Sequence, residues 1–416
     1  MYGGLTYGGA HKQGMNLAKV LDKNKFNVRY FWCRPAIDKY SGFKHPLVDL
    51  MFLDDLRKNG VEVVEFKVGY RDISQKNHPW FETNFFEIFN LYKTDFIFAV
   101  RSGQAEFPVM HINKPFIEWN VFGGVDKSSN LVYSVAVSPW VQKQYLQRGG
   151  DKLKSDFCFT GINVPMSQEN FRQDYKIEKN TIVLGFHQRV DDGICGEHAL
   201  LAWKTAKDKT NKELAFLVLG GSENYKEIAK KLGLNVFFLP ISTDSVFISK
   251  FLNTLDIYTH SGKAGESLGV AIEEAMMHKL PVVAMKGKYN GHVDVIGETT
   301  QVTENIEQYS ELLLRLINDD ALRSSISEKS FKRAKLLFSF DGMKQYFENL
   351  FTALYNKYCI ENINNFSVVP MDIYNHLSVR MIMYRILYRF PRLLNFVLSF
   401  RNKLLIIINK SKYGNR

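Results

Sequence analysis

The stretch THSGKAGESLGVAIEEAMMHKLPVVA, residues 259–284, carries the strongest structural signal in the chain. It reads as the end of a buried strand, a loop rich in Gly and Ser, a helix over 268–279 and a second apolar strand over 280–285. Strands that are apolar throughout and alternate with helices are typical of parallel sheets covered on both faces. The stretch therefore predicts an α/β domain.

The same alternation extends over most of the chain, in two series. The first series has predicted strands at 26–32, 61–68, 94–100, 115–122, 133–138 and 156–163. The second has strands at 181–187, 214–221, 235–240, 255–260 and 280–285, with helices at 197–208, 223–232 and 268–279. We expect two facing, doubly wound, Rossmann-like domains that bind ligands at the carboxyl ends of their strands.

These patterns also predict the domain boundaries. Residues 1–165 form the first domain and 166–340 the second, with the polar stretch 164–180 as the connection between them. The segment 341–358 reads as one long amphipathic helix that packs back on the first domain, and 359–416 as a basic, amphipathic, helical tail.

Composition excludes several classes of protein. The hydrophobic and charged fractions, 45% and 23%, are those of a folded globular chain. The four cysteines have no metal-ligand spacing, which indicates reduced thiols in a cytoplasmic protein. We expect no secretory leader and no membrane-spanning segment, because no suitable apolar run occurs.

The net charge of +11 is concentrated in the tail. No acidic residue follows Asp372, and nine Lys or Arg residues lie within 377–416. Basic residues interleaved with apolar ones favour binding to an anionic membrane surface, which predicts a cytoplasmic protein attached to the inner membrane face. A docking helix for a protein partner is the alternative. Nucleic acid is not expected as a partner, because no recognition motif accompanies the charge.

Two carboxylates bracket the loop and helix of the opening stretch. Glu266 precedes the helix, whereas Glu274 lies on it, so the two do not share one helical face. Unpaired N–H groups at a helix start suit a diphosphate, and Gly lets the backbone approach it closely. The alternative is that Glu266 only complements the helix dipole and Glu274 is an exposed helix residue.

With its loop and flanking strands, this segment resembles the E-x7-E element of glycosyltransferase family 4, which has the GT-B architecture. The resemblance runs from about residue 3 to about 358 and is specific in the C-terminal half. It implies a nucleotide-sugar donor bound mainly by the C-terminal domain and transfer of the sugar with retention. It also implies no cofactor and no required metal, and Asp-x-Asp, the metal-binding signature of the other major glycosyltransferase architecture, is absent from the sequence.

The resemblance assigns roles in the second domain. Glu266 contacts the donor sugar and phosphates as a catalytic residue, and Glu274 holds the ribose. The remaining donor-binding residues belong to the loops around the diphosphate: Arg189, Lys263, Gly265, Ser267, Leu268 and Gly269. The family's Lys five residues after the Arg falls on Ile194, so Lys263 is a candidate for the missing cation, with a solvated loop lysine as the alternative.

In the first domain, YGGAHKQGMNLAKVL resembles the family's Gly-Gly turn and first helix. Gly8, Gly9 and His11 are therefore expected beside the donor or the acceptor. The alternatives are a flexible N-terminus for the glycines and a solvent-exposed residue of the first turn for His11. In FIEWNVFGG, residues 116–124, Glu118 or Asn120 takes the place of the family's polar strand-end residue, often a His. Glu118 is a candidate base for the acceptor hydroxyl, with a purely structural role as the alternative.

The family has a buried strand before the Gly-Gly turn, but only Met1 and Tyr2 precede Gly3 here. We therefore expect the natural start to lie about one strand upstream.

The resulting prediction is a retaining hexosyl- or related glycosyltransferase. It moves sugar from a nucleotide-sugar donor to a saccharide or lipid-linked saccharide acceptor in cell-surface glycan synthesis, such as polysaccharide or lipopolysaccharide. A nucleotide-sugar epimerase of the same architecture and a non-catalytic partner subunit are the alternatives.

Overall fold

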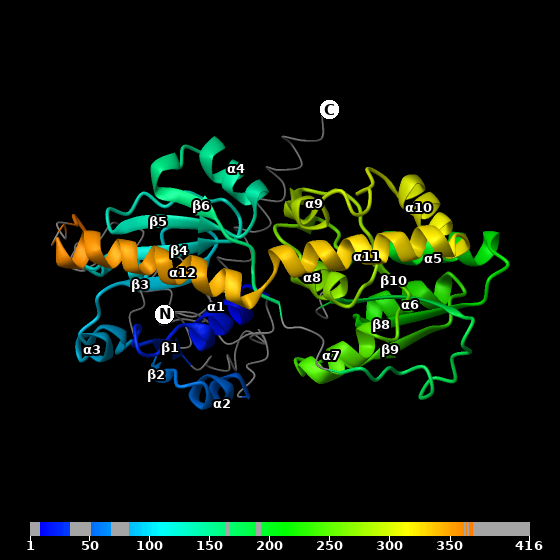
Figure 1. Cartoon of the computed structure of the whole chain (residues 1–416), viewed down its shortest axis with the longest axis horizontal. Helices are drawn as coiled ribbons and strands as arrows, with labels where there is room; N and C mark the ends of the chain where they lie inside the picture. The colour runs from blue at the N-terminus through cyan, green and yellow to red at the C-terminus, as the bar shows by residue number, and fades with distance from the viewer. Residues whose placement is uncertain are drawn as a thin grey trace, which may run out of the picture.

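A computed structural model describes residues 9–33, 51–67, 83–162, 167–188, 193–361, 363 and 366–368. Two α/β domains lie side by side, the N-terminal one on the left and the C-terminal one on the right of Figure 1. All strand pairs in the sheets of both domains are parallel. The predicted architecture of two doubly wound domains is confirmed.

The described strands of the N-terminal domain form two groups. β1 (Arg29–Cys33) pairs with β2 (Glu62–Phe66), and a four-stranded sheet has the order β3 (Ile97–Arg101), β4 (Phe116–Asn120), β5 (Leu131–Ala136), β6 (Ser155–Phe157). Its helices are α1 (Gly9–Val20), α2 (Met51–Lys58), α3 (Phe85–Asn90) and α4 (Pro139–Gln147). One hydrophobic core cluster of this domain is rich in buried aromatic side chains, and in it Phe66 and Phe85 pack edge to face.

The C-terminal domain is a five-stranded sheet. Its strands lie in the order β12 (Val282–Val283), β10 (Ile257–Thr259), β7 (Ile182–Gln188), β8 (Leu214–Gly220), β9 (Val236–Leu239). Its main helices are α5 (His198–Lys209), α6 (Glu223–Lys231), α7 (Ser245–Leu252), α8 (Val270–Met277), α9 (Gly291–Ile296), α10 (Ile306–Asn318) and α11 (Asp320–Leu337). From β7 the chain adds β8 and β9 on one side of the sheet and then β10 and β12 on the other, so the strand order reverses between β7 and β10. The carboxyl ends of these two strands are therefore the expected place for a ligand.

Polar side chains fix where many helices begin. In α4, α6, α7, α10 and α11, the residue before the helix accepts a hydrogen bond from an N–H group of the first turn: Ser138, Ser222, Asp244, Asn305 and Asp319. Such caps satisfy N–H groups that have no partner inside the helix, and each typically contributes about 1 kcal/mol.

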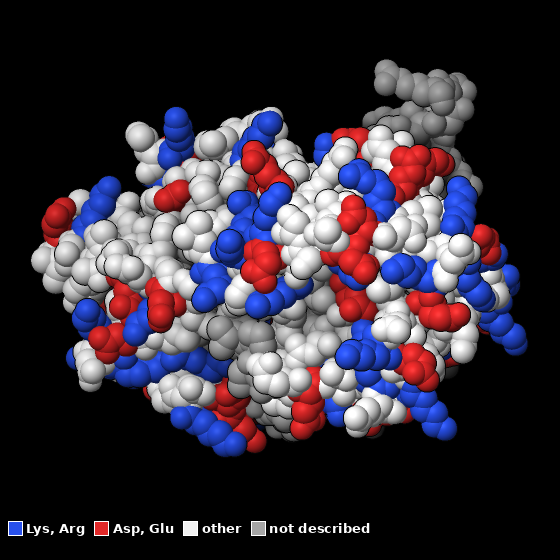
Figure 2. Space-filling view, turned by 45° about the vertical axis from the view of Figure 1, so that its right-hand side comes forward, with Lys and Arg blue, Asp and Glu red and all other residues white. Residues whose placement is uncertain are grey.

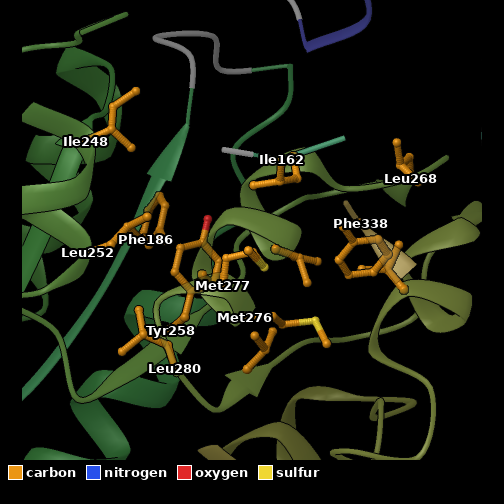
Figure 3. Packing of buried hydrophobic residues seen from close by; sticks show 14 of the residues in the cluster. Ile162, Phe186, Ile248, Leu252, Tyr258, Leu268, Met276, Met277, Leu280 and Phe338 are labelled. Carbon is orange, nitrogen blue, oxygen red and sulfur yellow. The ribbon is translucent and has the colours of Figure 1, made fainter. Parts of the chain in front are cut away.

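Helix α8 is anchored by its apolar face. Figure 3 shows Met276 and Met277 packed among Tyr258 of β10 and Phe338, which comes from the end of α11. Met276 and Tyr258 have no exposed surface. Because α8 carries Glu274, this packing fixes the position of that carboxylate relative to the sheet.

The chain crosses between the domains at two adjacent points. The first crossing follows β6, and the second joins α11 to α12 (Phe340–Tyr355), which lies over the N-terminal domain in Figure 1. The two crossings are hydrogen-bonded to one another, because the Ile162 N–H donates to the Phe338 carbonyl at 2.9 Å. On the N-terminal domain, Phe347 of α12 packs edge to face on Trp119 at 4.8 Å between ring centroids.

Some predictions fall on residues outside the described part. These are the turn at 3–8 and the basic tail over 377–416. None of the described helices is both long and apolar enough to cross a membrane. On the face drawn in Figure 2, acidic and basic side chains of the described residues are interspersed.

Candidate functional site

The candidate site lies where β7 and β10 end, and glycines shape its loops. Gly265 has a φ of +67°, and a Cβ there would lie 2.1 Å from the Tyr289 carbonyl oxygen. A Cβ on Gly291 would lie 1.7 Å from the Ser267 carbonyl oxygen. Both contacts are closer than any side chain allows, so only Gly lets these backbone segments meet.

Glu266 lies on the short strand β11 (Gly265–Glu266), which pairs with β13 (Tyr289–Asn290). Its N–H donates to Nδ1 of His292 at 3.2 Å, and the other nitrogen of that buried ring, Nε2, lies 3.1 Å from the Met285 carbonyl oxygen. The ring therefore holds the backbone of Glu266 in place, while the carboxylate side chain remains 32% exposed.

A second histidine lies beside the Glu266 carboxylate. Nε2 of His260, directly after β10, is 3.7 Å from Oε1 of Glu266 and has no hydrogen-bond partner among the described residues. Burial, together with the nearby His292 and His198, lowers the pKa of His260 well below its usual value. The ring is therefore neutral, and its unpaired nitrogen is directed at the carboxylate.

Glu274 is held from both domains. Its Oε2 is 2.8 Å from Nε2 of His187 at the end of β7, and its Oε1 is 3.4 Å from Nζ of Lys12 on α1. Burial raises the pKa of Glu274, but the Lys12 ammonium and the His187 ring outweigh this effect and lower the pKa to about 2. Glu274 is thus an ionised carboxylate at neutral pH, at the boundary between the domains.

The start of α8 lies between the two carboxylates in the chain. Its N-cap, Gly269, has a φ of +101° and no side chain, so the first N–H groups of the helix receive no side-chain capping bond. The loop before it is joined to the N-terminal domain, since the Ser138 hydroxyl donates to the Ser267 carbonyl at 2.9 Å. The Leu268 side chain is buried, so only its backbone is available to a ligand.

The predicted base Glu118 requires a correction. Its side chain has no exposed surface, and Oε2 accepts from Nε of Arg101 at 2.7 Å. Oε1 accepts from Ser134 at 2.6 Å and from Asn120 at 3.1 Å, and Arg101 also pairs with Asp126. Burial raises the pKa of Glu118, and the Arg101 guanidinium opposes that rise. With both oxygens occupied inside the domain, Glu118 has a structural role.

Gly265, predicted among the donor-binding residues, lies in the loop before Glu266. Its N–H donates to the Gly262 carbonyl oxygen at 3.2 Å. With its φ of +67°, Gly265 allows the left-handed turn that places Glu266.

The other predicted residues are described to different extents. Lys263 is exposed in the loop before Glu266, and its N–H donates to the Ile194 carbonyl oxygen. Gly9 and His11 lie in α1, and the side chain of His11 is outside the described part of the structure. Residues Gly8 and Arg189 also lie outside it.

Sequence reasoning missed four residues of the site: Lys12, His187, His260 and His292. Three of them follow from the fold, because His187 and His260 stand at the ends of the two strands where the strand order reverses, and Lys12 is one residue after His11. His292 does not follow from the fold in the same way, because nothing in the sequence indicates that this residue of α9 has no exposed surface.

Comparison with known protein families gives one match. Residues 167–333, which contain β7 to β13 and the Glu266 and Glu274 loop and helix, match the family described as "Glycosyl transferases group 1". No curated protein has a significantly similar sequence.

Several solved structures superpose on most of this chain. HepE of Anabaena, solved with UDP and glucose, superposes with a TM-score of 0.62 at 15% identity, covering 85% of this chain and 98% of its own. A glycosyltransferase of Rickettsia africae has a TM-score of 0.62 at 17% identity, over 86% and 97% of the two chains. Sucrose-phosphate synthase of Thermosynechococcus elongatus reaches 0.60 at 15% identity, over 86% and 96%. The chain therefore has the GT-B fold.

Proposed function

We propose that this chain, whose C-terminal domain belongs to the group 1 glycosyl transferases, is a retaining glycosyltransferase. It transfers a sugar, in the leading case a hexose, from a nucleotide-sugar donor to a saccharide or lipid-linked saccharide acceptor of a cell-surface glycan. The neighbours that support this proposal include HepE, solved with UDP-glucose, and the lipopolysaccharide outer core galactosyltransferase WaaB.

One observation carries the proposal: two carboxylates and an uncapped helix start lie together where β7 and β10 end. Glu274 contacts His187 of β7, and Glu266 lies beside His260 of β10. In a doubly wound sheet this edge is where nucleotides bind. Ribose hydroxyls suit an ionised carboxylate such as Glu274, and a diphosphate suits the N–H groups at the start of α8.

The proposed chemistry follows from charge. When the acceptor hydroxyl replaces the nucleoside diphosphate at the anomeric carbon, negative charge grows on the departing phosphate oxygen. The N–H groups of α8 and nearby cations such as Lys263 stabilise that charge. Glu266, whose backbone is fixed by His292 and whose carboxylate is a third exposed, contacts the donor sugar. No step of this proposal uses a metal.

A peripheral position at the inner membrane face is part of the proposal. It is supported by the nine basic residues of 377–416 and by their apolar neighbours in the sequence. Binding of the full chain to vesicles of phosphatidylglycerol, compared with phosphatidylcholine, tests it. Absence of binding to either kind of vesicle would argue for a protein partner instead.

The experiment that tests the function measures nucleoside diphosphate release from UDP-, GDP- and ADP-sugars, with a lipid extract as acceptor and with or without EDTA. We expect release that requires the extract, persists in EDTA and falls at least a hundredfold in Glu266→Gln and Glu274→Gln. Glu223→Gln is the matched control, since its carboxylate is exposed and pairs with Lys226 on the surface of α6. The product's anomeric configuration, read by NMR, tests retention.

The alternatives give different results. An epimerase converts the donor without the extract and releases no acceptor-bound sugar. A non-catalytic subunit binds a nucleotide but shows no turnover with any donor. Folded protein that neither binds nor converts any of the three nucleotide series would refute the proposal.

A further inference from the structure

We propose that Lys12 is a cation for the donor diphosphate, which pairs with Glu274 while the site is empty and transfers to the phosphates when the ribose binds. This inference rests on the proposed function. It adds a ligand-binding residue that comes from the N-terminal domain, whereas Glu266, Glu274 and the start of α8 all come from the C-terminal domain.

The contact between Lys12 and Glu274 has the geometry of a loose pair. The Nζ to Oε1 distance is 3.4 Å, longer than the 2.7–2.9 Å that is usual between an ammonium and a carboxylate. On the same helix, Nζ of Lys19 approaches Asp55 to 2.6 Å. Lys12 is also 23% exposed, so its ammonium keeps contact with solvent. Such a pair exchanges its partner more readily than the shorter pair of Lys19 and Asp55.

Ribose and Lys12 need the same oxygen of Glu274. Oε2 is already held by His187 at 2.8 Å, which leaves Oε1 for the hydroxyl groups of the ribose. Lys12 occupies Oε1 in the structure. A ribose that donates its hydroxyls to Oε1 therefore weakens the bond that keeps Lys12 in place.

The displaced ammonium has a partner within reach. The first phosphate of a nucleoside diphosphate is bonded to C5′ of the same ribose, so a cation beside the ribose carboxylate is one sugar ring from that phosphate. The lysine side chain has a flexible stem of four carbons, so its ammonium can move from the carboxylate to the phosphate. Ordering the flexible side chain on the phosphate is offset by a charge-assisted hydrogen bond.

The described part of the site also needs positive charge. Glu266 and Glu274 are both carboxylates, and each repels a diphosphate. Among the described residues, Lys12 of α1 contacts Glu274, and Lys263 lies three residues before Glu266 in the loop. Because Lys12 comes from the other domain, its transfer to the donor would join the two domains through the ligand.

Binding of nucleosides with different numbers of phosphates tests the inference. Calorimetry on the full chain measures uridine, UMP and UDP, with the guanosine and adenosine series in parallel. We expect Lys12→Met to weaken diphosphate binding about 10- to 100-fold, the range of a charged hydrogen bond, and to change nucleoside binding less than about threefold. Lys12→Arg should retain most of the affinity.

Lys19→Met is the matched control, because Lys19 lies on the same helix and also pairs with a carboxylate, but within one domain. It should leave all three affinities unchanged. Equal weakening of nucleoside and diphosphate by Lys12→Met would show a fixed structural bridge and overturn the inference, while the proposed function stands. Wild-type protein that binds none of the nucleotides would remove the proposed function itself.

Discussion

Replacing Glu118 by Gln separates a structural role from a catalytic one. The substitution conserves the shape of the side chain but removes its charge and places an amide NH₂ where one oxygen accepts hydrogen bonds. Glu118 accepts from Arg101, Ser134 and Asn120, at 2.6 to 3.1 Å, and has no exposed surface. At least one of these donors would face another donor in the variant.

The magnitude follows from burial. Breaking a fully buried ion pair by removing one partner costs about 3–5 kcal/mol, because the remaining charge is left poorly compensated. Arg101 keeps Asp126 at 2.5 Å, which favours the lower end of that range. For a domain of this size, each kcal/mol shifts the unfolding midpoint by about 2–4 °C, so we expect a fall of roughly 6–12 °C in Tm for Glu118→Gln.

Thermal unfolding followed by circular dichroism measures this shift. Asp208→Asn is the control, since Asp208 pairs with Lys204 on an exposed helix face and such a pair contributes only about 0.3–0.5 kcal/mol. Transfer activity per folded molecule should be nearly unchanged in Glu118→Gln. A variant with wild-type Tm and abolished turnover would show that Glu118 is a catalytic residue and that the structural argument is wrong.

Three further outcomes are expected. Because the folded pKa of Glu274, about 2, lies below its ordinary value of 4.5, its contribution of about 3 kcal/mol is fully present above pH 4.5 and disappears as the pH falls towards 2. The difference in urea midpoint between wild type and Glu274→Gln should therefore shrink between pH 7 and pH 3, and a constant difference would contradict this. Gly265→Ala should lower donor affinity, because its Cβ would displace the loop that lies against Tyr289. Gly233→Ala, with a similar φ of +66° but open space, should affect only stability, by about 1–2 kcal/mol. Equal donor affinities of the two variants would contradict the role of the loop. Phe347→Ala should reduce the free energy of unfolding by about 3–5 kcal/mol in urea titrations, and a loss below 1 kcal/mol would show that α12 is not a main support of the N-terminal domain.

Much of the fold was predictable because its strands are apolar throughout. The predicted strand 181–187 corresponds to β7, and the predicted helix 223–232 to α6. Buried strands of a parallel sheet cannot alternate with polar residues, so the apolar runs mark them clearly.

Boundaries were less predictable where an apolar run continues past its strand. The run 156–163 predicts one strand, but β6 ends at Phe157. The buried residues Cys158 and Ile162 belong instead to the crossing towards the second domain. An apolar run indicates that residues are buried, but it does not distinguish a strand from a buried connection.

The site was predictable only where its residues are close in sequence. Glu266 and Glu274 belong to one continuous loop and helix, so both could be predicted as site residues from their spacing in the sequence. Lys12 and His187, which contact Glu274, lie 262 and 87 residues from it in the sequence, and no local pattern predicts such contacts. The role of Glu118 depended on Arg101, which the sheet brings into contact across two neighbouring strands.

The paired crossings between the domains determine how the molecule can deform. Since the Ile162 N–H donates to the Phe338 carbonyl, the two connecting segments are joined to one another at this point, which we call the hinge. Thr160, on the first crossing, also donates to the buried Glu273 of α8 at 2.5 Å, which ties the hinge to the helix that carries Glu274. Two connections side by side resist twisting of one domain against the other but permit bending about the line through them. While no nucleotide is bound, opening along that line would separate Lys12 from Glu274, so the ion pair between them would report on how far the hinge is bent.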